Sequence, residues 1–303
     1  MPQPTLAPQS FREIEFSPLR QLVETNLQAR PKGFGFCGII TCDIQRYEDF
    51  AQRCHRARCR PPGLYAYFSR CLGVLLHECP ELLAVRLKKK LLIPSRVDAV
   101  VAVEMNAYDG AQIPGTVYLA DLGGRALNDI AEELKVGLRR AKRTVMQIPT
   151  ERRRFVPLWA PDWWRHFVKA LRDSRSQAQR ERAMQNACIQ LSSTTQWMNG
   201  KSGWGVQLYN TMALSVTLAG SSRRPTATDN DEIVLHRFID VVLNFNHIIT
   251  DGAPATRFIA ALIAEVESGR LLEEYPVIVR KSRPTRATNN DVASRDRIKA
   301  SSM

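Results

Sequence analysis

The chain has 303 residues, of which 44% are hydrophobic, and its 43 basic and 30 acidic side chains give a formal net charge of +13. This length is ample for a hydrophobic core, and no run approaches the ~18 apolar residues that span a bilayer, which excludes a membrane-spanning helix. The positive charge suits an anionic partner such as a nucleic acid, a phosphate-bearing cofactor or an acidic carrier protein, or it is a basic surface without a target.

The N-terminus and the cysteines indicate a reducing compartment. Residues 1–10 are polar and lack the apolar segment of a signal peptide, so we expect a cytoplasmic protein without membrane association. Seven cysteines, an odd number, are consistent with reduced thiols. Several lie near histidines but lack paired Cys-x-x-Cys spacing, so we expect no metal site. These residues are Cys54, His55, Cys59, Cys71, His77 and Cys79.

The first half of the chain predicts alternating helices and strands. Residues 1–16 are expected to form a loose arm, and Ser17-Pro18 starts a helix because proline fits the first helical position. Periodicity and proline breaks divide the rest into elements. In chain order these are a helix over 19–28, a strand over 33–42, helices over 47–59 and 64–77, strands over 82–92, 99–105 and 116–119, and a helix over 128–143.

The segment over residues 146–186 has a different character. Three consecutive arginines at 152–154 precede an aromatic cluster of Phe155, Trp159, Trp163, Trp164 and Phe167. Basic side chains interleaved with aromatic ones can bind single-stranded nucleic acid. An aromatic stripe at helical spacing more often packs against the domain or a neighbouring subunit. We therefore expect a packed insertion and no nucleic-acid partner.

The second half of the chain again predicts both kinds of element. They are strands over 187–193, 212–219 and 233–245, a polar hairpin tip over 221–232, an amphipathic helix over 255–267 and a disordered tail over 281–303. The order of strands and helices does not follow a regular βαβ alternation. The sequence therefore predicts an α+β fold, a two-layer sandwich with a mixed β-sheet and packed helices, in one domain over residues 17–280.

His247 is the strongest candidate for a catalytic side chain. It follows the long apolar strand and precedes Asp251 and Gly252, so a rigid element holds it beside a turn. Histidine is best suited to proton transfer near neutral pH, although a lone histidine beside an apolar strand is more often a packed core residue. Asp251 can fix local geometry through its carboxylate, and we expect Gly252 to allow a turn that a Cβ would obstruct.

The sequence around His247 resembles a known family. The stretch NHIITDGAPATRFIAALIAEVESG resembles the signature of the catalytic cores of 2-oxoacid dehydrogenase dihydrolipoyl acyltransferases, and more broadly the chloramphenicol acetyltransferase superfamily, through the pattern His-x-x-x-Asp-Gly. SPLR at residues 17–20 resembles the start of the first helix in those cores, and CIQLSS at residues 188–193 resembles their strand that ends in a Thr-x-Ser-Asn type sequence. The likeness covers residues 17–145 and 187–270.

The resemblance implies a chloramphenicol acetyltransferase-like fold and a mechanism. His247 would take a proton from an acceptor thiol or hydroxyl that attacks a thioester carbonyl, and Ser192 would donate a hydrogen bond to the oxyanion. Asp251 would support the histidine by pairing with Arg20, without relaying a proton. The family also implies a homotrimer with active sites between subunits, His247 from one subunit and Ser192 from its neighbour. Acyl-CoA, an acyl carrier protein or a lipoyl thioester would be the co-substrate, with no cofactor bound covalently.

Several features depart from the dehydrogenase cores. Asn246 and Ile248 stand where those cores usually carry aspartate and arginine. We also expect no lipoyl domain or flexible linker before the core that starts at residue 17. We therefore expect a stand-alone acyltransferase, in specialised metabolism, that acylates a hydroxyl, thiol or amine of a small molecule. Two alternatives stay open: a catalytically inactive scaffold that kept the fold, and the lipoyl-dependent core of a dehydrogenase complex.

Overall fold

The computed structural model describes the chain in seven stretches. They are residues 33–87, 90–106, 112–147, 189–206, 209–210, 212–228 and 230–277. The expected arm and first helix, the insertion beyond Gln147 and the tail over 281–303 lie outside the described residues.

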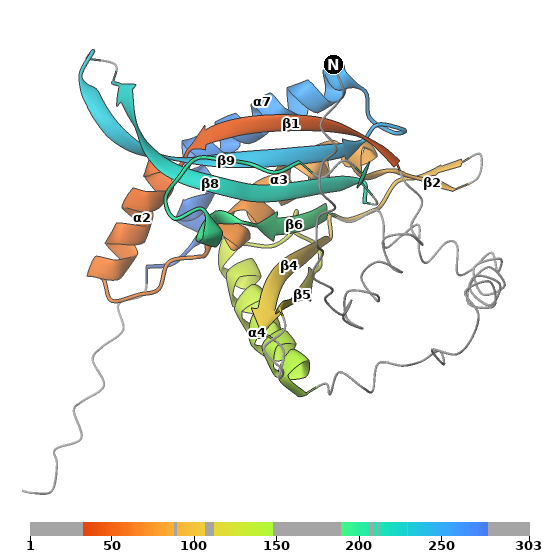
Figure 1. The fold of residues 1–303 in the computed structure, drawn as a ribbon, viewed down its shortest axis with the longest axis horizontal. Helices are drawn as coiled ribbons and strands as arrows, with labels where there is room; N and C mark the ends of the chain where they lie inside the picture. The colour runs from red at the N-terminus through yellow and green to blue at the C-terminus, as the bar shows by residue number, and fades with distance from the viewer. Residues whose placement is uncertain are drawn as a thin grey trace, which may run out of the picture.

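A mixed β-sheet of seven strands forms one layer of the described molecule (Figure 1). In chain order the strands are β1 (Gly33–Asp43), β4 (Ala99–Asn106), β5 (Gln112–Leu119), β6 (Ile189–Ser193), β7 (Tyr209–Asn210), β8 (Leu214–Ala227) and β9 (Ile233–Asn246). Across the sheet they lie in the order β5-β4-β6-β8-β9-β1-β7. β6 is parallel to both of its neighbours, and the other pairs are antiparallel.

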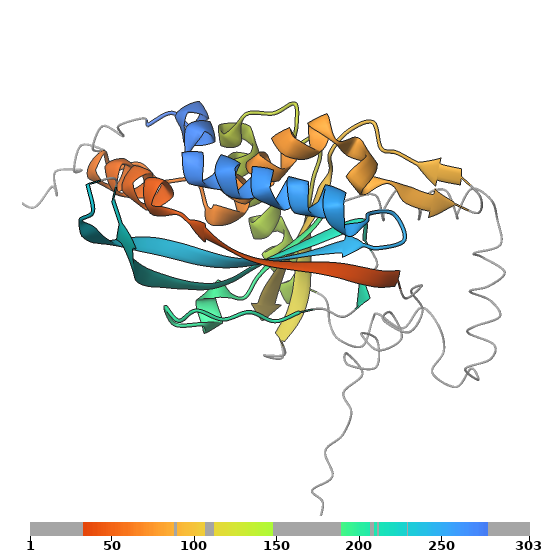
Figure 2. The ribbon, with the colours of Figure 1, turned by 90° about the horizontal axis from the view of Figure 1, so that it is seen from above.

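The second layer consists of helices that cover one face of the sheet (Figure 2). In the described residues the α-helices are α2 (Gln45–Arg56), α3 (Leu64–Glu78), α4 (Leu127–Gln147) and α7 (Gly252–Ser268). Glycines allow two of them to approach the strands closely. A Cβ at Gly38 of β1 would lie 2.4 Å from Cδ1 of Ile259 in α7. A Cβ at Gly137 of α4 would lie 2.3 Å from Cγ1 of Val117 in β5.

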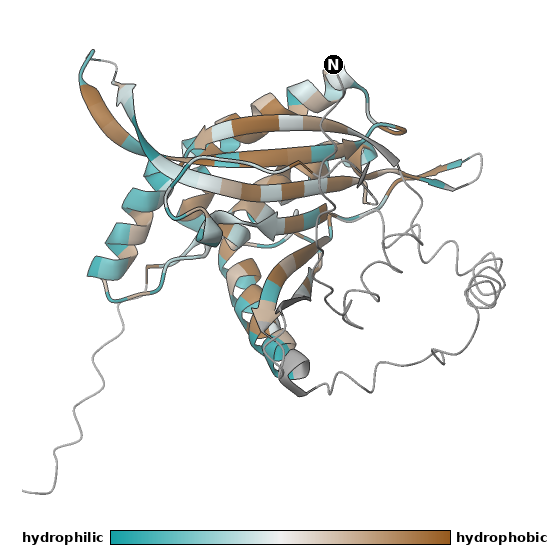
Figure 3. Ribbon diagram, viewed as in Figure 1, coloured by the Kyte–Doolittle hydropathy of each residue, from teal (hydrophilic) through white to brown (hydrophobic). Residues whose placement is uncertain are grey.

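Successive residues of each strand face opposite sides of the sheet. Leu191 of β6, Val216 of β8 and Leu243 of β9 point toward the helices and are fully buried in the core. The residues that alternate with them point toward the other face, which none of the helices α2, α3, α4 and α7 covers (Figure 2). Hydrophobic residues are concentrated in these central strands, whereas α2 is mostly hydrophilic (Figure 3). The two-layer α+β sandwich expected from the sequence is therefore confirmed.

The region expected as one strand over 82–92 is instead a short helix followed by a hairpin. The 3-10 helix η1 (Pro80–Leu83) begins at a proline, and both of its leucines are buried. The chain then forms β2 (Val85–Leu87) and β3 (Lys90–Leu92), which pair with each other in a separate antiparallel sheet. The prediction of one strand over residues 82–92 was wrong because the apolar residues of η1 pack against α3 instead of alternating along a strand.

The hairpin of β8 and β9 is longer than the sequence predicts. Residues 221–232 were expected as a polar tip, but the strand ladder continues until Ala227 pairs with Ile233. Only residues 228–232 connect the strands. The polar composition was misleading because the outer half of the hairpin is exposed or half-buried on both faces, where polar side chains suit a strand. The other expected elements of the described residues are confirmed, with ends that differ by a few residues.

The cysteines of the described residues behave mainly as small hydrophobic side chains. Cys54 and Cys71 are fully buried in the core. Within the described ranges, no three histidine, cysteine, aspartate or glutamate side chains lie close enough to hold a metal ion. Among the helices placed by the structure, none is long and apolar enough to cross a bilayer.

Candidate active site

His247 lies in a tight turn between β9 and α7. Asn246 holds the backbone of this turn, because its carbonyl oxygen accepts the N–H groups of Ile249 at 2.9 Å and Thr250 at 3.0 Å. The side-chain Oδ1 of Asn246 also accepts the N–H of Ile248 at 3.1 Å. Thr250 is buried, whereas the side chain of His247 is 45% exposed. The turn therefore presents the imidazole to solvent from a fixed backbone.

Hydrogen bonding of the His247 ring determines which nitrogen can act as a base. Nδ1 lies 3.1 Å from the carbonyl oxygen of Thr250, and a carbonyl oxygen can only accept. Nδ1 therefore carries the proton in the neutral ring, and Nε2 has the free lone pair. Phe36 packs edge-on against the imidazole with ring centroids 5.9 Å apart, which restricts rotation of the ring. This is the geometry that a general base requires.

Asp251 does not orient the histidine through a direct hydrogen bond. Its Oδ1 lies 3.8 Å from Nδ1 of His247, and its side chain is 89% exposed. That distance exceeds the hydrogen-bond range. Asp251 occupies the N-cap position of α7 but makes no side-chain capping bond. Its expected partner, Arg20, lies outside the described residues, so the pairing of Asp251 with Arg20 stays a prediction.

The structure does not require a glycine at position 252 for the reason expected from the sequence. A Cβ at this position would lie 3.6 Å from Cε2 of Phe36, an ordinary contact, and the residue is not in the left-handed region. The expectation that a Cβ would obstruct the turn was wrong because Gly252 is already the first residue of α7. A Cβ at position 252 would therefore not clash with any of the described residues.

The two serines at the end of β6 face opposite sides of the sheet. Ser193 lies on the helix side, where its hydroxyl donates to Oγ1 of Thr195 at 2.9 Å and accepts the N–H of Thr195 at 3.1 Å. These bonds hold the start of the 3-10 helix η3 (Thr195–Trp197). Ser192 lies on the face away from the α-helices, and its Oγ is 2.9 Å from Oγ1 of Thr217. Ser192 is therefore the serine whose hydroxyl points away from the helical layer.

The strand register separates Ser192 from His247 within one chain. Ser192 is directly opposite Thr217 of β8, which is opposite Val242 of β9. His247 follows Val242 by five residues, and a strand advances ~3.3 Å per residue, so the two side chains lie about 17 Å apart along the strand direction. A single chain therefore does not bring both side chains to one substrate carbonyl.

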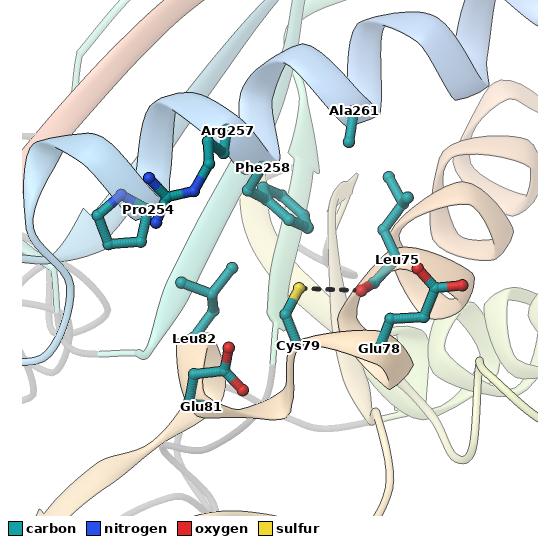
Figure 4. A pocket seen from close by; sticks show the side chains of 9 residues that line it. All are labelled: Leu75, Glu78, Cys79, Glu81, Leu82, Pro254, Arg257, Phe258 and Ala261. Atoms are coloured by element: carbon teal, nitrogen blue, oxygen red, sulfur yellow. Dashed lines mark hydrogen bonds between the residues drawn. The ribbon is translucent and has the colours of Figure 1, made fainter.

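A groove on the helical layer contains neither of these residues (Figure 4). It has a volume of about 330 Å³ and lies between the end of α3, η1 and the first turns of α7. Its polar side chains are Glu78, Glu81, Arg257 and Cys79. The thiol of Cys79 donates to the carbonyl oxygen of Leu75 at 3.0 Å, and burial raises its pKa to about 11. The thiol is thus protonated at neutral pH, and the groove offers no activated nucleophile.

Sequence reasoning missed two residues that contact the expected site. Asn246 was noted as a departure from the resembling family, but its hydrogen bonds hold the turn that carries His247. Thr217 was not considered, although its hydroxyl touches that of Ser192. The strand pattern could have indicated which face Thr217 occupies. Its position opposite Ser192 depends on the register of β6 with β8, which the sequence alone does not contain.

Solved structures match this fold, although no family model and no curated protein matches the sequence. Dihydrolipoamide acetyltransferase of Azotobacter vinelandii matches with a TM-score of 0.60 at 17% identity, over 89% of this chain and 99% of that one. That structure was used to study the roles of a serine, a histidine and an asparagine in the catalytic mechanism of that enzyme. The cubic core of a pyruvate dehydrogenase multienzyme complex gives 0.58 at 17% identity, over 89% and 99%. A probable dihydrolipoamide acetyltransferase from Listeria monocytogenes gives 0.58 at 15% identity, over 85% and 95%.

At these identities the likeness establishes the fold. The chain has the chloramphenicol acetyltransferase-like fold of the catalytic acyltransferase domains of 2-oxoacid dehydrogenases, as the sequence predicted. The likeness spans nearly the full length of each of these structures. The resemblance around His247 is thereby confirmed at the level of the fold.

Proposed function

We propose that the chain is an acyltransferase that moves an acyl group from a thioester to a hydroxyl, thiol or amine of a small molecule. The observation that carries this proposal is the turn of His247, in which the Thr250 carbonyl holds the proton on Nδ1 and leaves Nε2 free. The fold, which is that of acyltransferase catalytic domains, supports the same reaction class.

The reaction follows from these groups. Nε2 of His247 removes the proton of the acceptor X–H as X attacks the thioester carbonyl carbon, and a tetrahedral oxyanion forms. The Ser192 hydroxyl donates a hydrogen bond to that oxyanion, which lowers the barrier by ~3–4 kcal/mol where such a donor is well placed. The intermediate then expels the thiolate, which recovers its proton from the imidazolium. The products are the acylated acceptor and the free thiol.

The proposed active site lies between two copies of the chain. His247 and Ser192 lie about 17 Å apart along the strand direction in one chain, so a shared carbonyl requires the histidine of one subunit and the serine of another. None of the helices α2, α3, α4 and α7 lies on the sheet face that carries Ser192. We propose a homotrimer, and the similarity to the core of a multienzyme complex supports an assembly of subunits.

The proposed donor is an acyl-CoA, with an acyl carrier protein or a lipoyl thioester as the other donor classes. The net charge of +13 favours a phosphate-bearing donor. The dihydrolipoamide acetyltransferases that share the fold make dihydrolipoamide the first acceptor to test. Small alcohols and amines complete the acceptor panel.

The test is to incubate the full-length protein with acetyl-CoA and each acceptor and to quantify free CoA and acylated product by chromatography. We expect turnover with at least one acceptor and a loss of ~10²-fold or more in His247→Ala, because a positioned base contributes about that factor. The matched control is His55→Ala, an exposed histidine near the end of α2, which should keep the wild-type rate.

Two results would contradict the proposal. Equal rates for His247→Ala and the wild-type protein would remove His247 from the mechanism. No turnover of acetyl-CoA with any acceptor of the panel, at a protein concentration where the assembly is intact, would instead favour a scaffold that kept the fold without the chemistry.

A further inference from the structure

We infer that Thr217 is a positioning residue that aims the Ser192 hydroxyl at the oxyanion. This inference rests on the proposed role of Ser192 and extends it to a second residue. Thr217 itself does not contact the reacting atoms in this account. It acts by fixing where the single hydrogen of the Ser192 hydroxyl points.

The two residues are paired by the sheet itself. β6 and β8 are parallel, and Ser192 lies directly opposite Thr217 in their register. The Oγ of Ser192 and the Oγ1 of Thr217 are 2.9 Å apart, and both residues are half-buried on the face away from the helices. Flanking core residues such as Leu191 and Val216 point to the opposite face and anchor both strands. The pair is thus held by backbone and core packing, and it does not depend on a flexible loop.

The direction of this hydrogen bond decides whether Ser192 can act. A hydroxyl has one hydrogen, so a serine that donates to Thr217 has none left for an oxyanion. When Thr217 donates instead, Ser192 accepts through a lone pair and its own hydrogen is free. Accepting a bond also strengthens the donor power of a hydroxyl, because hydrogen bonds in a chain polarise one another. The developing oxyanion therefore favours the order Thr217 to Ser192 to substrate.

Threonine suits this role better than a flexible hydroxyl would. Its β-branched side chain has restricted χ1 freedom in a strand, so Oγ1 is already in place before substrate binds. Other hydroxyls near the end of β6 do not fill this position: Ser193 and Thr195 bond to each other on the helix side, and Thr195 also donates to the Ala219 carbonyl at 2.8 Å. Among the described residues, Thr217 is therefore the hydroxyl placed to orient Ser192.

The experiment is a double-mutant cycle in the full-length protein, with acetyl-CoA and the acceptor that gives the fastest turnover. Thr217→Val keeps the shape and removes the hydroxyl; we expect kcat to fall about tenfold with KM within about twofold, the size of one hydrogen bond that acts in the transition state. Thr217→Ser restores the hydroxyl and should recover most of the lost kcat. In a Ser192→Ala background, Thr217→Val should cost less than about twofold more, because the two residues act as a unit.

Controls and contrary outcomes separate this inference from the proposed function. Thr226→Val makes the same change in the outer part of β8, and its kcat and thermal midpoint should be comparable to those of the wild-type protein. A full tenfold loss from Thr217→Val in the Ser192→Ala background would show independent action and overturn the positioning role. So would an unchanged kcat in Thr217→Val while Ser192→Ala is impaired. If Ser192→Ala itself keeps wild-type kcat, the proposed role of Ser192 fails first.

Discussion

At the scale of single residues, the backbone of its own turn holds the ring of His247. The carbonyl of Thr250 selects the tautomer, and Asn246 holds the turn through both its backbone and its side chain. The nearby carboxylate of Asp251 is too distant from Nδ1 to hold the ring. The proposed base is therefore oriented by a backbone acceptor, and changes that loosen the turn should affect catalysis without altering the histidine itself.

Asn246 provides the residue-scale prediction. Asn246→Ala removes the acceptor for the Ile248 N–H, and we expect kcat to fall about tenfold because the turn loses one hydrogen bond of typical strength. Asn246→Asp keeps an oxygen acceptor and should retain most of the activity. The measurement is kcat with acetyl-CoA and the fastest acceptor. Equal losses in the two variants would show that the side-chain acceptor is not what matters at this position.

His247 could be proposed from the sequence, but its environment could not be predicted. His247 precedes Asp251 and Gly252 in a motif whose spacing can be recognised in the sequence alone. The bond from Nδ1 to the Thr250 carbonyl depends on the φ/ψ values of the turn, which no residue type in the segment dictates. The choice of Ser192 over Ser193 depended on the family resemblance, and strand alternation places the two hydroxyls on opposite faces of the sheet.

At the scale of secondary-structure elements, Asp240 joins several strands on the sheet face that carries Ser192. Its carboxylate accepts hydrogen bonds from Thr41 of β1 at 2.9 Å, from Arg224 of β8 at 2.8 Å, and from both the side chain of Ser202 and the N–H of Gly203. Burial alone would raise its pKa, but these hydrogen bonds outweigh that effect and lower the pKa below its ordinary value. The ionised carboxylate therefore stabilises the fold.

The element-scale prediction concerns the pH dependence of this stabilisation. Asp240→Asn should lower the free energy of unfolding at pH 7 by about 2 kcal/mol, because buried hydrogen bonds to a charged group are lost. A lowered folded-state pKa contributes stability above the unfolded value of about 3.9, and that contribution disappears as pH falls through the folded value. The difference between the variant and the wild-type protein should therefore shrink in acid.

Denaturant unfolding at pH 7 and in acid checks this prediction. Asp231→Asn, at the exposed hairpin tip, is the matched control and should change stability little at either pH. A difference between Asp240→Asn and wild type that is the same at both pH values would indicate that ionisation of Asp240 does not contribute.

The elements themselves were largely predictable, except where local packing or exposure overrode the pattern, as in η1 and in the outer half of β8.

At the scale of the whole molecule, the fold class was predictable from the sequence, and the spatial arrangement of the candidate site residues was not. The mixed order of strands and helices predicted a two-layer sandwich, which the structure has. Whether His247 and Ser192 meet depends on strand register and on assembly, and neither is written in local sequence patterns. Within one chain they are separated by about 17 Å along the strands, so the proposed site requires a second copy.

Complementation between two inactive variants tests this central claim directly. His247→Ala and Ser192→Ala chains with different affinity tags are coexpressed, and assemblies that carry both tags are purified. Each variant alone should be strongly impaired, but a mixed trimer contains one interface with a native histidine facing a native serine. We therefore predict recovery of about one third of the wild-type activity with acetyl-CoA, since one site in three is intact. Mixed assemblies as inactive as their parents would contradict an active site shared between subunits.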